Sequence, residues 1–274
     1  MLKDITLGQF FPGTSPIHRI DPRMKIIITI IYIIAVFFAK NIYSFALLVL
    51  FSIIITATSG IKSGVILKGF KPILFIVVFT AVINIFWTKG EVPLFEFSII
   101  QIYPEGIITA SFMIIRILSL VMGTSLLLSY TTSPIALTDA LERLMKPLKY
   151  LKVPVHEFSM MMTIALRFIP TLIEETEKII NAQKARGADF ESGNILRRAK
   201  ALIPILIPLF ISAFRRADEL AVAMECRCYH GGDGRTKMKI LKLSFGDFVW
   251  LTITILFTAG VFFINYIPTT ISLK

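Results

Sequence analysis

Two short segments of this 274-residue chain each place one arginine between two small residues at the end of a predicted helix. They are Ala185-Arg186-Gly187 and Cys226-Arg227-Cys228. An arginine at a helix C-terminus is favoured by the helix dipole, and its guanidinium offers a forked pair of donors to a carboxylate. Small neighbours allow a partner backbone to approach closely. The chemistry that this pattern predicts is docking of a partner protein rather than catalysis.

The two segments align when Arg186 is placed on Arg227. Ala182 then matches Ala223, and Glu177 matches Asp218. A solvated arginine that only caps its helix would explain either segment alone. The recurrence of the arginine, its small neighbours and the helix end favours docking for the pair.

Cys226 and Cys228 are the only cysteines of the chain, and they lie one residue apart. A structural disulfide is not expected on the cytoplasmic side of a membrane, and a metal site needs more ligands than His230 could add. We therefore predict two small side chains in a packed helix end, with no metal and no cofactor.

The composition is that of an all-α integral membrane protein. Hydrophobic residues make up 55% of the chain and charged residues only 17%, against roughly a quarter charged in an average soluble domain. A spanning helix needs about 20 mostly apolar residues. About five transmembrane helices are predicted from the apolar runs Ile26–Ala39, Ile42–Ile61, Pro72–Thr88, Gly106–Tyr130 and Phe248–Leu273. The first is short.

Basic residues set the expected orientation. Arg19, Arg23 and Lys25 precede the first span, whereas the third connection is acidic. Because cytoplasmic loops are enriched in lysine and arginine, the N-terminus is predicted to be cytoplasmic. This asymmetry accounts for most of the net charge of +11, so nucleic acid is not needed as a partner. The start of the chain shows no cleavable signal peptide, and we expect a multi-pass protein in the lipid bilayer.

We predict three regions: residues 1–130 with four spans, residues 131–246 as a cytoplasmic or interfacial helical region, and residues 247–274 as the last span. In the middle region Pro134 begins an amphipathic helix. Residues 154–188 follow as a helix pair or as one long bent helix. The apolar stretch 201–214 contains two prolines and is expected to lie at the membrane interface or against other helices rather than to cross the membrane. A helix is expected to resume at Arg215 and to end at Arg227.

Arg116 and Asn84 are polar residues inside predicted spans whose partners need to be explained. Arg116 is costly there and should face protein, water or carbonyl groups. It either pairs with backbone carbonyls, holds the helices together or contacts another membrane subunit. Asn84 is expected to form an interhelical hydrogen bond.

The chain resembles the transmembrane T component of energy-coupling factor transporters, a class of bacterial or archaeal ATP-driven importers of vitamins and metals. The resemblance covers nearly the whole sequence. The segments that carry it are Ile17–Lys25, Ser133–Leu141, Leu166–Pro170, Ala182–Asp189 and Arg215–Glu225. One departure is clear: the second motif of the family usually reads Ala-Arg-Gly, and here cysteines flank Arg227. Cys228 therefore lacks the freedom of glycine to adopt a left-handed backbone.

The resemblance implies a division of labour. Two cytoplasmic ATPases hydrolyse ATP, a small membrane subunit captures the substrate, and the T component joins them through two coupling helices. Arg186 and Arg227 would anchor the ATPases, with their small neighbours at the positions of close approach. The sequence contains no phosphate-binding Gly-x-x-x-x-Gly-Lys loop, as expected for a subunit that does not bind ATP itself. The alternatives are a conventional permease with its own substrate pathway and a membrane-embedded enzyme.

Overall fold

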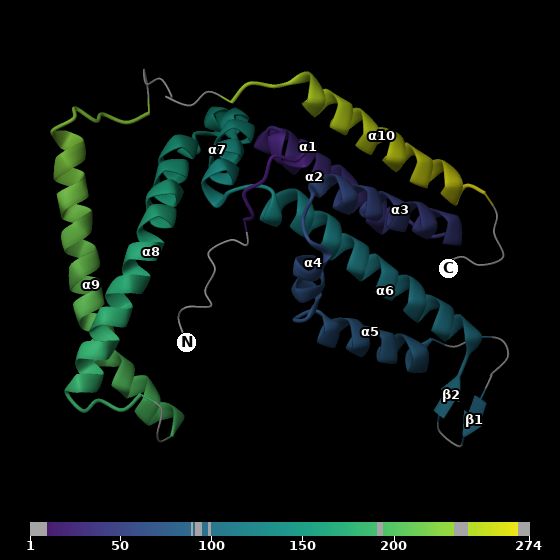
Figure 1. The fold of residues 1–274 in the computed structure, drawn as a ribbon, viewed down its shortest axis with the longest axis horizontal. Helices are drawn as coiled ribbons and strands as arrows, with labels where there is room; N and C mark the ends of the chain where they lie inside the picture. Colours follow the sequence, from purple (N-terminus) through teal and green to yellow (C-terminus); the bar gives the residue numbers. More distant parts are fainter. Residues whose placement is uncertain are drawn as a thin grey trace. The chain divides into compact units, whose positions relative to one another are not determined.

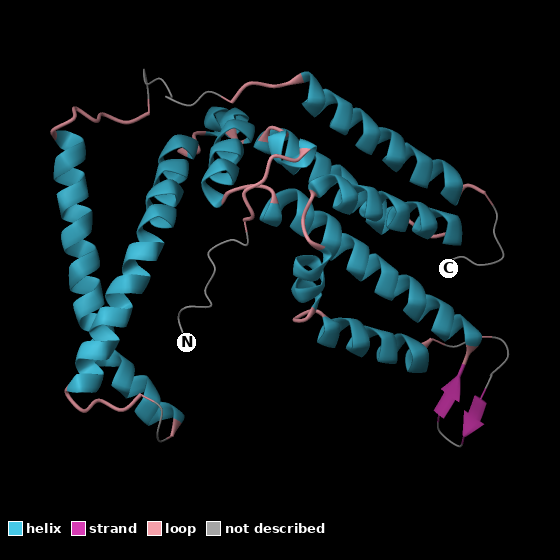
Figure 2. Cartoon of the chain, in the orientation of Figure 1, coloured by secondary structure: helices cyan, strands magenta, loops and turns pink. Residues whose placement is uncertain are grey.

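A computed structural model gives the fold and describes residues 10–88, 90, 95–97, 100–190, 194–232 and 241–267. The chain divides into two compact units. One comprises residues 138–240 and the other residues 8–137 with 241–274. Helices dominate both units, which confirms the all-α class, and two short strands form a hairpin (Figure 2).

The larger unit contains helices within all five predicted spans (Figure 1). Its elements are α1 (Pro16–Arg19), α2 (Pro22–Phe38), α3 (Ile42–Ser59), α4 (Ser63–Phe70), α5 (Leu74–Trp87), β1 (Phe95–Phe97), β2 (Ile100–Ile102), α6 (Pro104–Thr124), the π-helix η1 (Ser125–Tyr130) and α10 (Phe245–Asn265). The strands pair antiparallel. The last helix begins three residues before the predicted Phe248.

Helix length limits which of these elements can cross a bilayer. Three helices, α3, α6 with η1, and α10, are long and apolar enough, and α4 with α5 adds a fourth candidate bent by 57°. The fifth predicted span is α2. It has 17 residues and lies at the lower end of the length that a spanning helix needs.

Aromatic stacking fills the core of this unit. Tyr32 is fully buried, and its hydroxyl donates to the Ser119 carbonyl at 2.8 Å. The rings of Phe51 and Phe257 stack with centroids 4.0 Å apart, which joins α3 to α10. Gly123 of α6 faces the Tyr32 ring so closely that no side chain would fit there. The core therefore consists of helices that are far apart in sequence.

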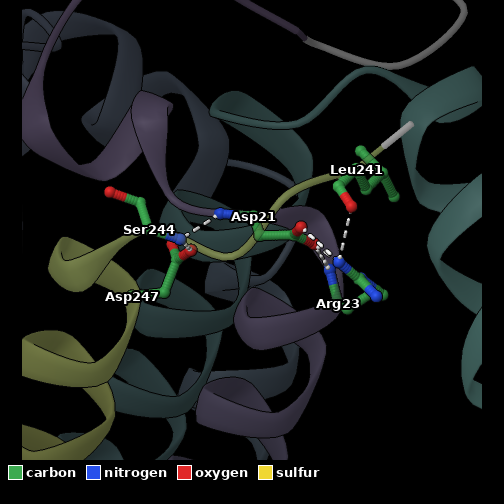
Figure 3. A network of polar contacts seen from close by, with 5 residues as sticks. All are labelled: Asp21, Arg23, Leu241, Ser244 and Asp247. Atoms are coloured by element: carbon green, nitrogen blue, oxygen red, sulfur yellow. Dashed lines mark hydrogen bonds and ion pairs between the residues drawn. The ribbon is translucent and has the colours of Figure 1, made fainter. Parts of the chain in front are cut away.

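A polar network fixes the start of α2 against the start of α10 (Figure 3). The buried Asp247 carboxylate accepts the backbone N–H groups of Asp21 at 2.8 Å and Ser244 at 2.7 Å. Asp21 forms an ion pair with Arg23 at 2.9 Å, and Arg23 also donates to the Leu241 carbonyl. One carboxylate thus satisfies the backbone of two helix N-termini.

Lys25 connects the start of α2 to the end of η1. It is 1% exposed, and its ammonium donates to the Thr131 carbonyl at 2.7 Å and to the hydroxyls of Thr131 and Thr132 at 3.1 Å each. These bonds satisfy all three donors of a buried charge. They also fix the chain at the point where it leaves the apolar helices.

Helix α7 (Pro134–Leu144) follows that point and leads into the smaller unit, which contains η2 (Lys146–Leu151), α8 (Val155–Ala185) and α9 (Ile195–Glu225). Glu142 joins α7 to α8 by accepting the Ser159 hydroxyl at 2.8 Å. One long helix, α8, covers most of residues 154–188, which was one of the two predicted alternatives. The stretch 201–214 lies against another helix, α8, which was one of its predicted alternatives. It differs from the expectation in that it is the middle of the continuous helix α9, so no new helix begins at Arg215.

Candidate functional site

The two arginine motifs lie at the C-terminal ends of α8 and α9, and both ends have the same backbone structure. Arg186 is the last residue before Gly187, whose φ is +85°. The N–H of Gly187 donates to the Lys184 carbonyl at 2.9 Å, and the N–H of Ala188 reaches back to Gln183 at 3.0 Å. This pair of bonds around a left-handed residue is the Schellman helix end.

The end of α9 repeats this pattern residue by residue. The N–H of Cys228 donates to Glu225 at 2.8 Å, and that of Tyr229 reaches back to Met224 at 3.1 Å. Cys228 has φ of +55°, so the left-handed position is present although glycine is absent. The alignment that places Arg186 on Arg227 therefore also places the capping hydrogen bonds of one end on those of the other.

All six residues of the two motifs are exposed. Within the described part of the chain, neither the Arg186 nor the Arg227 guanidinium has a hydrogen-bond or ion-pair partner. Each cap is made of backbone hydrogen bonds only, so the arginine side chain takes no part in it. A capping role for the side chain, the alternative left open by the sequence, has no hydrogen bond to support it among these residues.

Two contacts determine how α8 and α9 pack. Arg216 donates to Glu175 at 2.9 Å, and the Gln183 side chain donates to the Pro204 carbonyl at 3.4 Å. Residue numbers rise along α8 as they fall along α9, so the helices cross antiparallel. Their C-terminal ends therefore point in opposite directions from the crossing. The smaller unit presents two arginines far apart, not one combined site.

The described residues support no metal or disulfide at the cysteines. Cys226 and Cys228 are free and exposed, and no cluster of three or more possible metal ligands occurs among the residues that the structure covers. The prediction that they lie in a packed helix end is wrong in one respect, because both thiols are on the surface.

The structure places Arg116 against backbone, one of the predicted alternatives. Its Nη2 donates to the carbonyl of Ala39, the residue that ends α2, at 2.6 Å. Its guanidinium carbon also lies 5.5 Å from the centre of the Phe45 ring. A cation at a helix C-terminus is favoured by the dipole, so Arg116 compensates for the early end of the short helix α2.

Asn84 differs from the expectation. Its side chain donates to the Thr80 carbonyl at 2.8 Å, a bond within its own helix α5 and not between helices. The side-chain amide of Asn84 is therefore hydrogen-bonded by the backbone of its own helix, as short polar side chains in helices commonly are.

Asp247 is the polar residue that sequence reasoning missed. The signal available was Ser244 followed three residues later by an acid before an apolar run, which resembles a capping box. That pattern predicts the contact with Ser244. It contains nothing about the contact with Asp21, which is 226 residues away.

Comparisons with known proteins agree with this architecture. The family model described as cobalt transport protein matches residues 13–238. The chain is 56% identical over 250 residues to the energy-coupling factor transporter transmembrane protein EcfT of Clostridium kluyveri, a match that covers 91% of this chain and 92% of that protein. Proteins of the same name from Ruminiclostridium cellulolyticum and Bacillus subtilis are 55% identical over 267 residues and 45% identical over 265 residues. Those two matches cover 97% of this chain and 99% and 100% of the relatives. With a family model matched over most of its length and such identities over nearly all of it, the chain belongs to the family of energy-coupling factor transporter transmembrane proteins, the T components.

Proposed function

We propose that this protein is the coupling subunit that links ATP hydrolysis by two cytoplasmic ATPase subunits to uptake of a vitamin or metal through a separate substrate-binding membrane subunit. It has no catalytic activity of its own in this proposal. The observation that carries it is the pair of matching helix ends, each with a free, exposed arginine. Two equivalent but separated anchors suit two partners of similar structure.

Each anchor is proposed to enter an acidic groove of one ATPase. The exposed Arg186 and Arg227 would pair with carboxylates there, and Ala185, Gly187, Cys226 and Cys228 would allow the backbone to approach. The motif itself is well prepared for this role, because its Schellman cap holds the arginine backbone without using its side chain. Charge-assisted, forked hydrogen bonds of this kind are among the stronger polar contacts between proteins.

An apolar strip on α9 is proposed to contact the substrate-binding subunit. Ile203, Ile207, Phe210 and Phe214 recur at helical spacing and are between 49% and 67% exposed. A strip of this kind has to be covered by lipid or by another protein. The proposed site of action is the cytoplasmic membrane of a bacterium or archaeon, with the N-terminus inside.

Reconstitution with the ATPases and a substrate-binding subunit tests the proposal. Arg186→Glu and Arg227→Glu are each expected to reduce binding of one ATPase, and the double variant should abolish uptake. The matched control is Lys178→Glu, a charge reversal at an exposed position about two turns before the end of α8. Normal assembly and uptake by the double variant would overturn the proposal. Uptake by the chain alone, without ATPases, would instead support the conventional permease.

A further inference from the structure

A recess of about 450 Å³ lies beside the first turn of α10, within the larger unit. Its lining includes Thr14 and Arg19 from the segment around α1, and Ser244, Gly246 and Trp250 from the start of α10. A recess of this size falls within the range of small-molecule sites in proteins. Neither the family comparison nor the proposed coupling role assigns any function to it.

The recess carries a positive charge that the protein does not neutralise. Arg19 is exposed, and its side chain has no hydrogen-bond or ion-pair partner among the described residues. Asp247 also lines the recess, but it is only 1% exposed, and its carboxylate and that of Asp21 already have partners. Asp21 pairs with Arg23, and Asp247 accepts two backbone N–H groups (Figure 3). The Arg19 guanidinium is therefore open to water and to a partner from outside these residues, and an anion is the partner that it would bind most strongly.

The position of the recess along α10 indicates which anion. This helix is a candidate span that begins at Phe245, and Trp250 lies little more than one turn further on. Tryptophan is enriched where a spanning helix passes through the lipid headgroups. Phe245 and Phe248, 84% and 51% exposed, extend an apolar surface from the same turns. The recess, which could hold a charged lipid headgroup, thus lies next to an apolar helix surface that could contact acyl chains.

We propose that this recess binds the phosphate headgroup of an anionic phospholipid in the leaflet where α10 begins. Arg19 would donate to the phosphate oxygens, since a guanidinium matches that geometry with two parallel hydrogen bonds. Trp250 would contact the glycerol region, and the exposed phenylalanines would lie along the acyl chains. Asp247 makes one wall of the recess rigid, because it fixes the first turn of α10 against the residues around Asp21.

Fluorescence quenching by brominated lipids tests this site directly, because Trp250 and Trp87 are the only tryptophans of the chain. The Trp87→Phe variant leaves Trp250 as the sole reporter. It is reconstituted at full length in phosphatidylcholine vesicles that contain increasing fractions of brominated phosphatidylglycerol. Half-maximal quenching is expected at a low fraction, and brominated phosphatidylcholine should require a much higher one. Equal quenching by the two lipids would overturn the headgroup site.

Substitutions then test whether Arg19 is the cation that binds the headgroup. Arg19→Gln should raise the fraction for half-maximal quenching about ten-fold, equivalent to about 1.4 kcal/mol, and Arg19→Lys should give an intermediate value. Lys71→Gln is the matched control, because it removes another exposed cation of the same unit. If the control changes quenching as much as Arg19→Gln, the effect is general surface charge and the site is refuted. Soluble glycerol phosphate at millimolar concentration distinguishes the sources: relief of quenching would show a site for free phosphates and overturn the lipid assignment.

Discussion

Replacing Asp247 by asparagine should loosen the junction between the starts of α2 and α10. The carboxylate accepts two backbone N–H groups, at 2.8 and 2.7 Å, and is 1% exposed. An asparagine amide can accept only one of them, because its NH₂ group faces the other as a second donor. One buried N–H loses its partner at about 1–3 kcal/mol, and the remaining bond loses its charge assistance. We therefore expect a loss of about 2–4 kcal/mol of local stability.

Hydrogen exchange of the purified protein measures this loss at the affected amides. The amide protons of Asp21 and Ser244 should exchange roughly 30- to 700-fold faster in Asp247→Asn, since 1.4 kcal/mol corresponds to a factor of ten. Asp218→Asn, at an exposed carboxylate of α9, is the control and should leave both amides unchanged. Unchanged protection of both amides in a folded Asp247→Asn protein would refute the argument, because neither N–H would then depend on the carboxylate.

Substitutions at four further positions test other contacts through thermal unfolding in detergent. Cys228→Gly should stabilise the end of α9 by about 0.5–1 kcal/mol and Gly187→Ala should destabilise the end of α8 by a similar amount, because both positions are left-handed. A change of the same sign in both variants would contradict the shared cap. Arg116→Leu should cost about 1–3 kcal/mol by leaving the carbonyl that ends α2 unpaired, and a raised midpoint would show that burying the guanidinium outweighs the bond. Lys25→Met should lower the midpoint, with Lys25→Arg retaining part of the stability, since three hydrogen bonds are lost; an unchanged midpoint would contradict a stabilising role.

The sequence predicted the features that depend on local pattern. Apolar runs identified the positions of α2, α3, α5, α6 and α10, because a helix inside a membrane must be uniformly apolar over its length. The alignment of Arg186 with Arg227 predicted two equivalent helix ends, since the residue pattern of a cap lies within one turn. Where composition or one turn of helix decides the structure, neighbouring residues suffice.

Prediction failed where distant contacts decide. Pro204 and Pro208 suggested an interruption, because proline removes a backbone donor and favours a break. In the structure α9 runs through both, and the Pro204 carbonyl receives a hydrogen bond from Gln183 of α8. Similarly, Asn84 bonds within its own helix, and Asp247 reaches a backbone 226 residues away. The partners of Pro204 and Asp247 cannot be read from neighbouring residues, whereas the partner of Asn84 is local and the error was to expect an interhelical bond.

The crossing of α8 and α9 relates the two docking ends to each other. The offset that places Arg186 on Arg227 also places Glu175 on Arg216, so the ion pair joins equivalent positions of the two helices. Beyond the crossing, both arms run the same number of residues to their arginines, about 16 Å at 1.5 Å per residue. Neither arm contains proline or glycine before its cap, whereas Pro170, Pro204 and Pro208 all precede the crossing. Because helices bend most readily at proline, we expect a displacement of the α9 end by an ATPase, as proposed, to bend this helix at Pro204 and Pro208, where it packs on α8, and not between Arg216 and Arg227.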